Sequence, residues 1–196
     1  MPAEISWINQ KLQSLDRDPD AFTQLYGEMK KPMYAVAYRI TGNREDAEDS
    51  VQEAFVSLLR SEKKASVRNG RAYLFQIVHN EALRRLREHA REVACEDSGE
   101  LAGAEPNGLS QNAAFSQDDT WHSEFEGSDV DYAMNRLAPE ERRIVSLRVE
   151  AELGYAEIAK VTGFSLATVF RRYRAAIRKL QEYFGRSGEN PESGKE

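Results

Sequence analysis

Apolar side chains recur every three or four positions along most of the chain, which is the spacing of one face of an α-helix. In the first such segment they are Ala21, Phe22, Leu25, Met29, Met33, Val36, Ala37 and Ile40. Thr41-Gly42-Asn43 follows, and glycine readily takes the left-handed conformation that ends a helix. Pro32 inside the segment predicts a kink or a break, because proline lacks the amide hydrogen.

The same period predicts helices in both halves of the chain, at 44–60, 72–91, 130–137, 155–161 and 166–184, with a further segment from Pro139 onward. Thr162-Gly163-Phe164 is a tight turn, and Ser165 caps the helix after it. No strand pattern or internal repeat occurs. We predict an all-α protein of two small helical domains, the second of them a helix-turn-helix in which Ile158, Val161, Val169 and Ile177 form the core.

Residues 92–131 show no persistent period and contain 11 Asp and Glu but no Lys or Arg. We interpret them as an acidic linker between an N-terminal domain, 1–91, and a C-terminal domain, 132–185, with a disordered tail at 186–196. The net charge of the chain is −6, but outside the linker 27 basic residues face 22 acidic ones. The excess of +5 there is compatible with a nucleic-acid partner.

Composition excludes several classes of protein. The single cysteine, Cys95, rules out a disulfide framework and fits a cytoplasmic location. The three histidines lack the spacing of metal ligands, and no phosphate-binding loop or nucleophile elbow is present, so we expect no metal, no cofactor and no catalysis. The N-terminus lacks the features of a signal peptide, and no apolar stretch is long enough for membrane insertion.

Two segments carry a local excess of basic residues. Between Tyr155 and Phe184 six basic residues face two acidic ones, and the second helix of a helix-turn-helix enters the major groove, where arginine binds guanine edges or phosphates. Between Arg60 and Arg91 nine basic residues face three acidic ones, with Tyr73 and Phe75 among them. Aromatic and basic side chains together are typical of single-strand binding, although either aromatic residue could instead belong to the core.

A third segment is acidic and begins the helix 44–60 with Glu45, Asp46, Glu48, Asp49 and Glu53. Carboxylates are favourable at a helix N-terminus, so composition alone favours a solvated helix end over a protein-docking face.

These segments resemble a known family. FTQLYGEMKKPMYAVAYRITGNREDAEDSVQEAFVSLLR and GRAYLFQIVHNEALRRLR are similar to region 2 of a bacterial sigma factor, and LAPEERRIVSLRVEAELGYAEIAKVTGFSLATVFRRYRAAIRKL is similar to region 4. Two regions without a third domain between them resemble the extracytoplasmic-function (ECF) group. The resemblance covers about 20–91 and 130–184. The preceding segment, ISWINQKLQSLD, lies outside it and its role is open.

The resemblance implies three sets of contacts. The acidic helix binds the clamp helices of core RNA polymerase, whose flap is a further contact, and the residues concerned are Asp46, Asp49, Gln52, Glu53 and Val56. The melted −10 element is held by Lys63, Lys64, Arg68, Asn69, Tyr73, Asn80, Arg84 and Arg85. The −35 duplex is read by Ser165, Thr168, Phe170, Arg171, Arg172, Arg174 and Arg178. Family analogy also implies an anti-sigma factor as a partner.

This sequence departs from the family at three positions, two of them among these contacts. Members commonly carry tryptophan where Tyr73 stands, and many carry glycine and lysine where Ala167 and Phe170 stand. Phe170 either contacts a thymine methyl group or turns into the core. The promoter sequence therefore does not follow from the resemblance.

The favoured function is that of an alternative sigma factor, which recruits core polymerase and opens promoter DNA. The alternative is a stand-alone helix-turn-helix regulator, which would need neither the acidic docking helix nor the basic-aromatic segment. A helical nucleic-acid hydrolase would need clustered carboxylates or histidines, which the sequence lacks. We further expect the acidic linker to repel DNA from the free protein, and the two domains to move independently.

Overall fold

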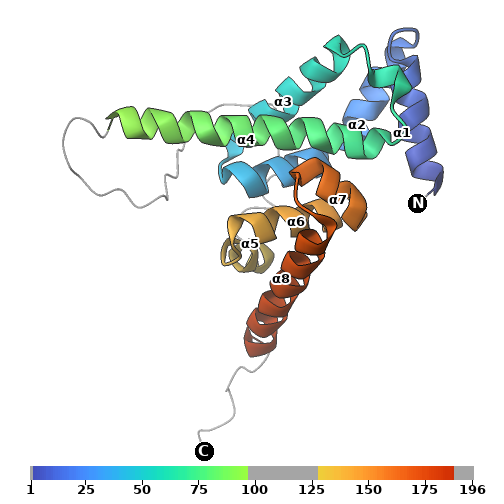
Figure 1. Ribbon diagram of the computed structural model, residues 1–196. Coiled ribbons are helices and arrows are strands. Elements are labelled where there is room, and N and C mark those ends of the chain that lie inside the picture. Colours follow the sequence, from blue (N-terminus) through green and yellow to red (C-terminus); the bar gives the residue numbers. More distant parts are fainter. Residues whose placement is uncertain (1, 97–127, 188–196) are drawn as a thin grey trace, which may run out of the picture.

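The computed structural model describes residues 2–96 and 128–187, and every regular element in these ranges is a helix (Figure 1). The elements are α1 (Pro2–Ser14), α2 (Pro19–Thr41), α3 (Arg44–Arg60), the 3₁₀ turn η1 (Lys64–Ser66), α4 (Gly70–Glu96), α5 (Asp129–Asn135), α6 (Pro139–Val149), α7 (Tyr155–Thr162) and α8 (Leu166–Ser187). The predicted all-α class is confirmed.

Local sequence accounts for the helix ends in the first half. The Asp18 side chain accepts the backbone N–H of Asp20 at the start of α2. Gly42 ends α2 in the left-handed conformation, at φ 76°, and its N–H bonds to the carbonyl of Tyr38. Asn43 then caps α3 by accepting the backbone N–H of Asp46 at 2.8 Å. Each cap satisfies a backbone group that the helix itself leaves unpaired.

Some boundaries differ from the prediction. Helix α2 continues through Pro32 without a break, and α4 is longer at both ends than 72–91. Helices α4 and α5 both extend into the ends of the predicted linker, while 97–127 lie outside the described residues. Helix α8 reaches Ser187, and the rest of the predicted tail lies outside them as well.

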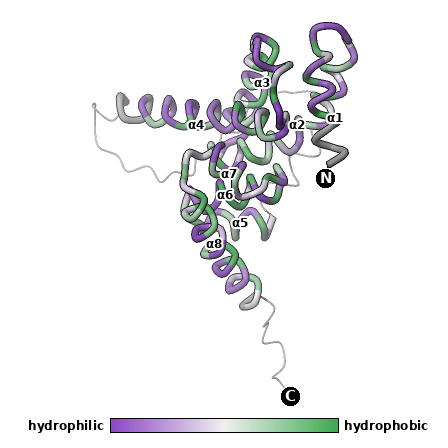
Figure 2. Tube along the Cα trace, turned by 45° about the vertical axis from the view of Figure 1, so that its right-hand side comes forward, coloured by the Kyte–Doolittle hydropathy of each residue, from purple (hydrophilic) through white to green (hydrophobic). Residues whose placement is uncertain are grey.

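Helices α2, α3 and α4 pack together as the main body of the first half. Their buried faces include Leu25, Met33, Phe55, Leu58 and Leu74. Figure 2 shows the underlying pattern, with hydrophilic and hydrophobic positions alternating along α4 and α8. Helix α1 lies at one end of this body, against η1 and the start of α4 (Figure 1).

The second half packs α8 against α6 and α7. Ile158, Val161 and Val169 are buried between them, as predicted, whereas Ile177 is only half-buried. Gly163 forms the turn between α7 and α8 in the left-handed conformation, at φ 76°. A side chain at that position would strain the backbone, so the turn depends on glycine.

The two halves do not lie apart. Helix α6 packs on α2, and α7 packs on α4. Ile144 and Leu147 of α6 belong to the same buried cluster as Leu25 and Phe55 of the first half. The expectation of independently moving domains is therefore not met in this structure, because apolar faces on α6 and α7 are covered by the first half.

Candidate polymerase and nucleic-acid interfaces

The helix-turn-helix places α8 with its N-terminus capped and exposed. The Ser165 hydroxyl accepts the backbone N–H of Thr168 at 3.2 Å and also shares a hydrogen bond with the Thr168 hydroxyl at 2.8 Å. Ser165 is exposed and Thr168 half-buried. The two predicted −35 contacts at the start of the helix are thus neighbours, and their hydroxyls are paired with each other.

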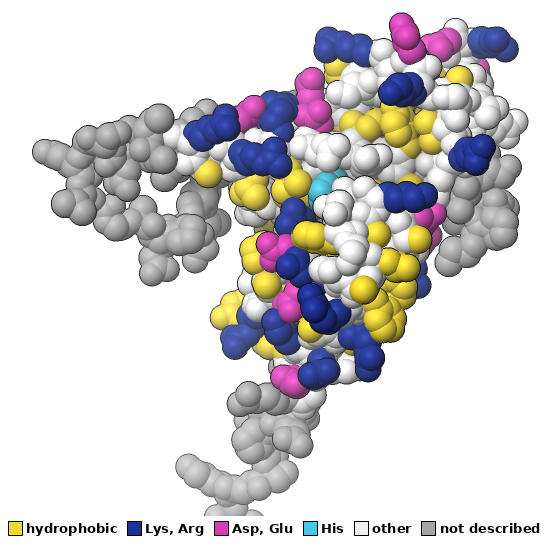
Figure 3. Space-filling view, in the orientation of Figure 1, with side chains coloured by type: hydrophobic (Ala, Val, Ile, Leu, Met, Phe, Trp, Pro, Cys, Tyr) yellow, Lys and Arg dark blue, Asp and Glu magenta, His cyan; other side chains and the backbone are white. Residues whose placement is uncertain are grey.

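Further along α8, the predicted residues form an exposed basic stripe. Arg171, Arg174 and Arg178 are exposed and lie three or four positions apart, which places them on one side of the helix. Phe170 is 46% exposed, packs edge-on against Tyr155 and lies 5.8 Å from the guanidinium of Arg174. Phe170 therefore does not turn into the core. Figure 3 shows basic and hydrophobic side chains intermingled over the lower part of the molecule, to which α8 belongs.

Arg172 differs from its basic neighbours. Its guanidinium carbon lies 4.6 Å from the centre of the Phe164 ring, and the residue is half-buried. Stacking on an aromatic face holds the guanidinium against the turn between α7 and α8. The structure therefore separates Arg172 from the exposed stripe with which the sequence groups it.

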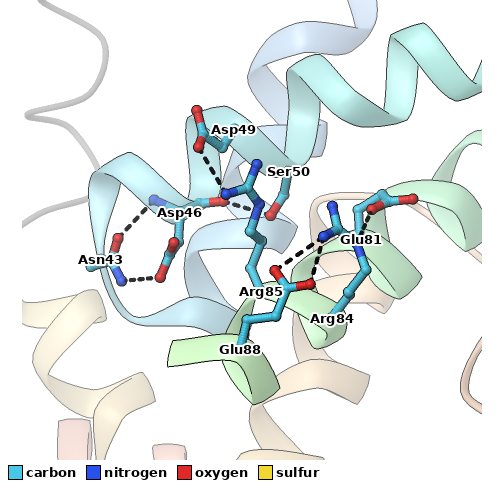
Figure 4. A network of polar contacts seen from close by, with 8 residues as sticks. All are labelled: Asn43, Asp46, Asp49, Ser50, Glu81, Arg84, Arg85 and Glu88. Carbon is cyan, nitrogen blue, oxygen red and sulfur yellow. Dashed lines mark hydrogen bonds and ion pairs between the residues drawn. The ribbon is translucent and has the colours of Figure 1, made fainter. Parts of the chain in front are cut away.

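The acidic face of α3 is built around its N-terminal cap (Figure 4). Asn43 donates from its amide to the Asp46 carboxylate at 2.6 Å, and Ser50 donates to the Asp46 backbone carbonyl. Asp46, Asp49, Glu53 and Val56 are spaced along one side of the helix, while Gln52 is exposed beside them. Glu53 and Val56 are half-buried at the far end of this face.

An ion pair joins this acidic face to α4. The Arg85 guanidinium lies 3.1 Å from the Asp49 carboxylate, and both side chains are partly exposed (Figure 4). The Arg84 guanidinium beside it is shared between two carboxylates of its own helix, Glu81 at 2.9 Å and Glu88 at 2.8 Å. Both predicted −10 contacts on this part of α4 thus have protein partners, which nucleic-acid phosphates would have to displace.

The connection 61–69 between α3 and α4 exposes some of its basic residues and buries one. Lys63 and Arg68 are exposed. Lys64 is buried, with its ammonium group 2.8 Å from both the Leu59 carbonyl and the Asp16 carboxylate. The resemblance implies that Lys64 contacts the −10 strand, but the structure places its charge inside the fold.

The two aromatic residues of the basic segment, Tyr73 and Phe75, differ in burial. Phe75 is fully buried and belongs to the core, which settles the alternative that the sequence left open. Tyr73 is half-buried, and its hydroxyl shares a 2.7 Å hydrogen bond with that of Ser61. Tyr73, Asn80 and Arg84 lie on the same side of α4, with Asn80 exposed. Only Tyr73 of the two aromatic residues is therefore placed to contact a nucleic-acid base.

Two residues at the start of α4 also contact the second half of the molecule. Asn69 caps α4 by accepting the Ala72 N–H, and its amide nitrogen donates to the Glu157 carboxylate of α7. Arg71 donates to the Ala151 carbonyl at 2.7 Å, and its guanidinium lies 3.4 Å from the Glu152 carboxylate. Elsewhere in the same interface, a buried ion pair joins Arg39 of α2 to Asp131 of α5.

His79 lies in the same interface and is buried. Burial lowers the pKa of its imidazole from 6.5 to about 4, and the positive charge of Arg143 on α6 contributes in the same direction. The histidine is therefore neutral at physiological pH. Phe75 and Ala82, four positions before it and three after, are also buried, so the apolar period of α4 places position 79 on the buried side of the helix.

Residues 25–92 match the family model of sigma-70 region 2, and residues 128–180 match that of sigma-70 region 4. The chain belongs to the sigma-70 family. Both matches fall on the segments that resemble sigma factors in the sequence. Helix α1 lies outside both.

Curated relatives place this sigma factor in the ECF group. It is 30% identical over 157 residues to the ECF RNA polymerase sigma factor SigE of Mycolicibacterium smegmatis, covering 79% of this chain and 58% of the relative. It is 27% identical over 182 residues to SigW of Bacillus subtilis, covering 88% of this chain and 95% of that one. The sigma factor thus spans little more than half of the first relative and nearly all of the second.

Solved structures share its fold. The sigma factor RpoE of Bartonella quintana, solved in complex with the anti-sigma factor NepR, has a TM-score of 0.61 at 23% identity and covers 84% of this chain and 96% of its own. CnrH, solved in complex with the cytosolic domain of CnrY, has a TM-score of 0.57 at 18% identity, covering 96% and 99%. Among the described residues of this sigma factor, no helix is suited to cross a membrane and no acidic, histidine or cysteine cluster is suited to hold a metal.

Proposed function

We propose that this sigma factor binds core RNA polymerase, directs it to specific promoters and helps to open the −10 region. One observation supports the proposal. The chain matches both sigma-70 regions and also carries an acidic α3 face, a basic segment around the start of α4 and a basic stripe on α8. We propose that it catalyses no reaction itself. We also propose that it is located in the cytoplasm, where RNA polymerase works.

The −35 duplex is proposed to contact Arg171, Arg174 and Arg178, with Ser165 and Thr168 at the start of α8 and Phe170 beside the stripe. The −10 strand is proposed to contact the residues exposed or half-buried around the start and along one side of α4, namely Lys63, Arg68, Asn69, Tyr73, Asn80, Arg84 and Arg85. Bases stack on aromatic rings while phosphates pair with arginine and lysine. Lys64 is left out because its charge is buried.

Run-off transcription with bacterial core RNA polymerase on genomic fragments tests this function. New transcripts that appear only when the sigma factor is added would support it, and their start sites would identify the promoters. Absence of such transcripts, together with a mobility shift of duplex DNA without polymerase, would favour a stand-alone regulator instead. An anti-sigma factor is a further proposed partner, because the Bartonella quintana relative was solved with one. Pull-down from lysate would identify it.

A charge-matched pair of variants tests the proposed polymerase face. Asp49→Ala removes a carboxylate from this face, whereas Glu48→Ala removes one from the neighbouring side of α3, where it pairs with Arg44. We expect Asp49→Ala to weaken binding to core polymerase about tenfold and Glu48→Ala to leave it within about twofold, since losing a charge-assisted hydrogen bond costs 1.5–3 kcal/mol by order of magnitude, roughly tenfold or more. Equal effects of the two variants on the dissociation constant would count against this face.

A further inference from the structure

Helix α1 lies outside both family matches, yet it packs directly on the segment proposed to hold the −10 strand. Ile8 and Leu12 on one side of α1 are buried in the main core. The helix contacts η1 and the first turn of α4, and Figure 1 shows it beside that end of α4. Helix α1, which has no assigned role, therefore packs against the segment that carries the proposed DNA-binding residues.

One polar side chain of α1 makes the contact specific. Asn9 accepts the backbone N–H of Gly70 at 2.6 Å through its Oδ1, and its Nδ2 donates to the backbone carbonyl of Arg68 at 2.9 Å. These two backbone groups flank Asn69 on either side. A side chain some sixty positions earlier in the chain thus fixes the main chain on both sides of a proposed −10 contact.

The close approach of α1 to this segment depends on glycine. A Cβ atom at Gly70 would lie 2.6 Å from the Leu12 side chain and 2.8 Å from the Asn9 Oδ1. A larger residue would force these side chains to shift and would disturb the bond from Gly70 to Asn9. A second link from the same end of the chain is the ion pair of Asp16 with Lys64, at 2.8 Å.

We propose that Asn9 is a positioning residue for the −10 strand, which acts by holding residues 68–70 in the conformation that presents Arg68 and Asn69. The proposal rests on the proposed function. The apolar contacts of Ile8 and Leu12 attach α1 to the fold, whereas both hydrogen bonds of the Asn9 side chain go to the main chain of the DNA-binding segment. Loss of Asn9 therefore loosens that segment more than it destabilises the molecule.

The test compares three variants of the full-length chain in holoenzyme with bacterial core polymerase, on the strongest template from the run-off assay. Asn9→Ala removes both hydrogen bonds, and Asn9→Asp keeps the acceptor for Gly70 but loses the donor to Arg68. Gln10→Ala alters the exposed neighbour on the same helix and serves as the matched control. Promoter opening is followed by permanganate reactivity of unpaired thymines, on the parent template and on templates with single base changes in the opened region.

We expect Asn9→Ala to reduce opening about tenfold and to flatten the difference between parent and altered templates, with core affinity within about twofold of the unaltered protein. Asn9→Asp is intermediate, and Gln10→Ala is unchanged. Hydrogen exchange of the free protein provides a second measurement, in which the amides of residues 68–70 exchange faster in Asn9→Ala while those of α2 and α3 do not.

Three results would overturn the proposal. One is normal opening and normal template discrimination by Asn9→Ala. Another is loss of core affinity in parallel with opening. The third is unfolding of both Asn9 variants, which would make the residue simply structural. A transcriptionally silent unaltered holoenzyme would instead refute the proposed function, and the hydrogen-exchange comparison would still show whether Asn9 holds the segment.

Discussion

Lys64 lies in a run of basic residues, yet its ammonium group is enclosed between the Leu59 carbonyl and the Asp16 carboxylate. Phe75 lies two positions from Tyr73, and only Phe75 is fully buried. At the scale of single residues, type alone indicates what chemistry is available but not which way the side chain faces. For Lys64, that direction depends in part on Asp16, which lies between α1 and α2 and is distant in sequence.

His79 makes folding stability depend on pH. In the unfolded chain it binds a proton below about pH 6.5, but in the folded protein only below about pH 4. Unfolding between these values takes up a proton, so its contribution is fully present above pH 6.5 and is lost as the pH falls towards 4. We expect this loss to approach about 3 kcal/mol, because each pKa unit corresponds to about 1.4 kcal/mol.

Urea unfolding from pH 7.5 to 4.5 checks this expectation with the unaltered protein and His79→Gln. The groups facing His79, Arg143 of α6 and Arg87 of α4, stay charged throughout this range. Glu150, whose pKa burial raises, titrates in both proteins and cancels in the difference between them. The unaltered protein should lose stability more steeply with acid, and parallel curves would refute the prediction.

At the scale of elements, local sequence determines most of the fold. Helix α3 begins and ends where the period predicts, and α7 differs by one residue. Pro32 does not break α2 because its cost is local. The ring removes the hydrogen bond to the carbonyl of Glu28, an exposed residue whose carbonyl can bond to water. Ile8 and Leu12 contribute to the core, but their period in a short segment gave no indication of what α1 packs against.

Two glycines distinguish a helix interior from a helix end. Gly27 is exposed within α2, with no atom within 4 Å of an added Cβ, so Gly27→Ala should raise the free energy of unfolding by about 1 kcal/mol. Gly163 also has open space, but its φ of 76° strains any side chain, so Gly163→Ala should lower it by about 1 kcal/mol. Chemical unfolding measures both, and a shift of the same sign in the two variants would show that backbone conformation does not decide the outcome.

At the scale of the whole molecule, the packing of the two halves could not be predicted. The faces that meet belong to α2, α4, α6 and α7, and the apolar positions on each are equally compatible with the core of a separate small domain. Arg39 and Asp131 are typical surface residues by type, and only the packing of α5 near α2 buries them as a pair. The residues of the candidate surfaces on α3 and α8 are close together in sequence, so a sequence pattern could indicate them. Asn69 and Arg71 contact residues about eighty or more positions away, and no sequence pattern could indicate those contacts.

The buried pair gives a test of this packing. Arg39→Ala leaves the Asp131 carboxylate buried without its main counter-charge and should cost roughly 3 kcal/mol of stability. Arg44→Ala removes an arginine from the partly exposed pair with Glu48 within α3 and should cost less than about 1 kcal/mol. Small-angle scattering should show expansion of Arg39→Ala alone. Equal costs and equal dimensions for the two variants would indicate that the halves do not pack in solution.

The side-chain amide of Asn69 donates a hydrogen bond to Glu157 and is also a proposed contact of the promoter strand. The Glu157 carboxylate lies against the amide that the proposed promoter contact uses, and its negative charge repels the phosphates of a strand, so the two interactions are thermodynamically linked. If 99 of every hundred molecules hold the bond, promoter affinity is reduced about a hundredfold below its intrinsic value. A ligand that binds the form with this hydrogen bond more tightly than the form without it reduces promoter affinity further, by at most the ratio of its two affinities.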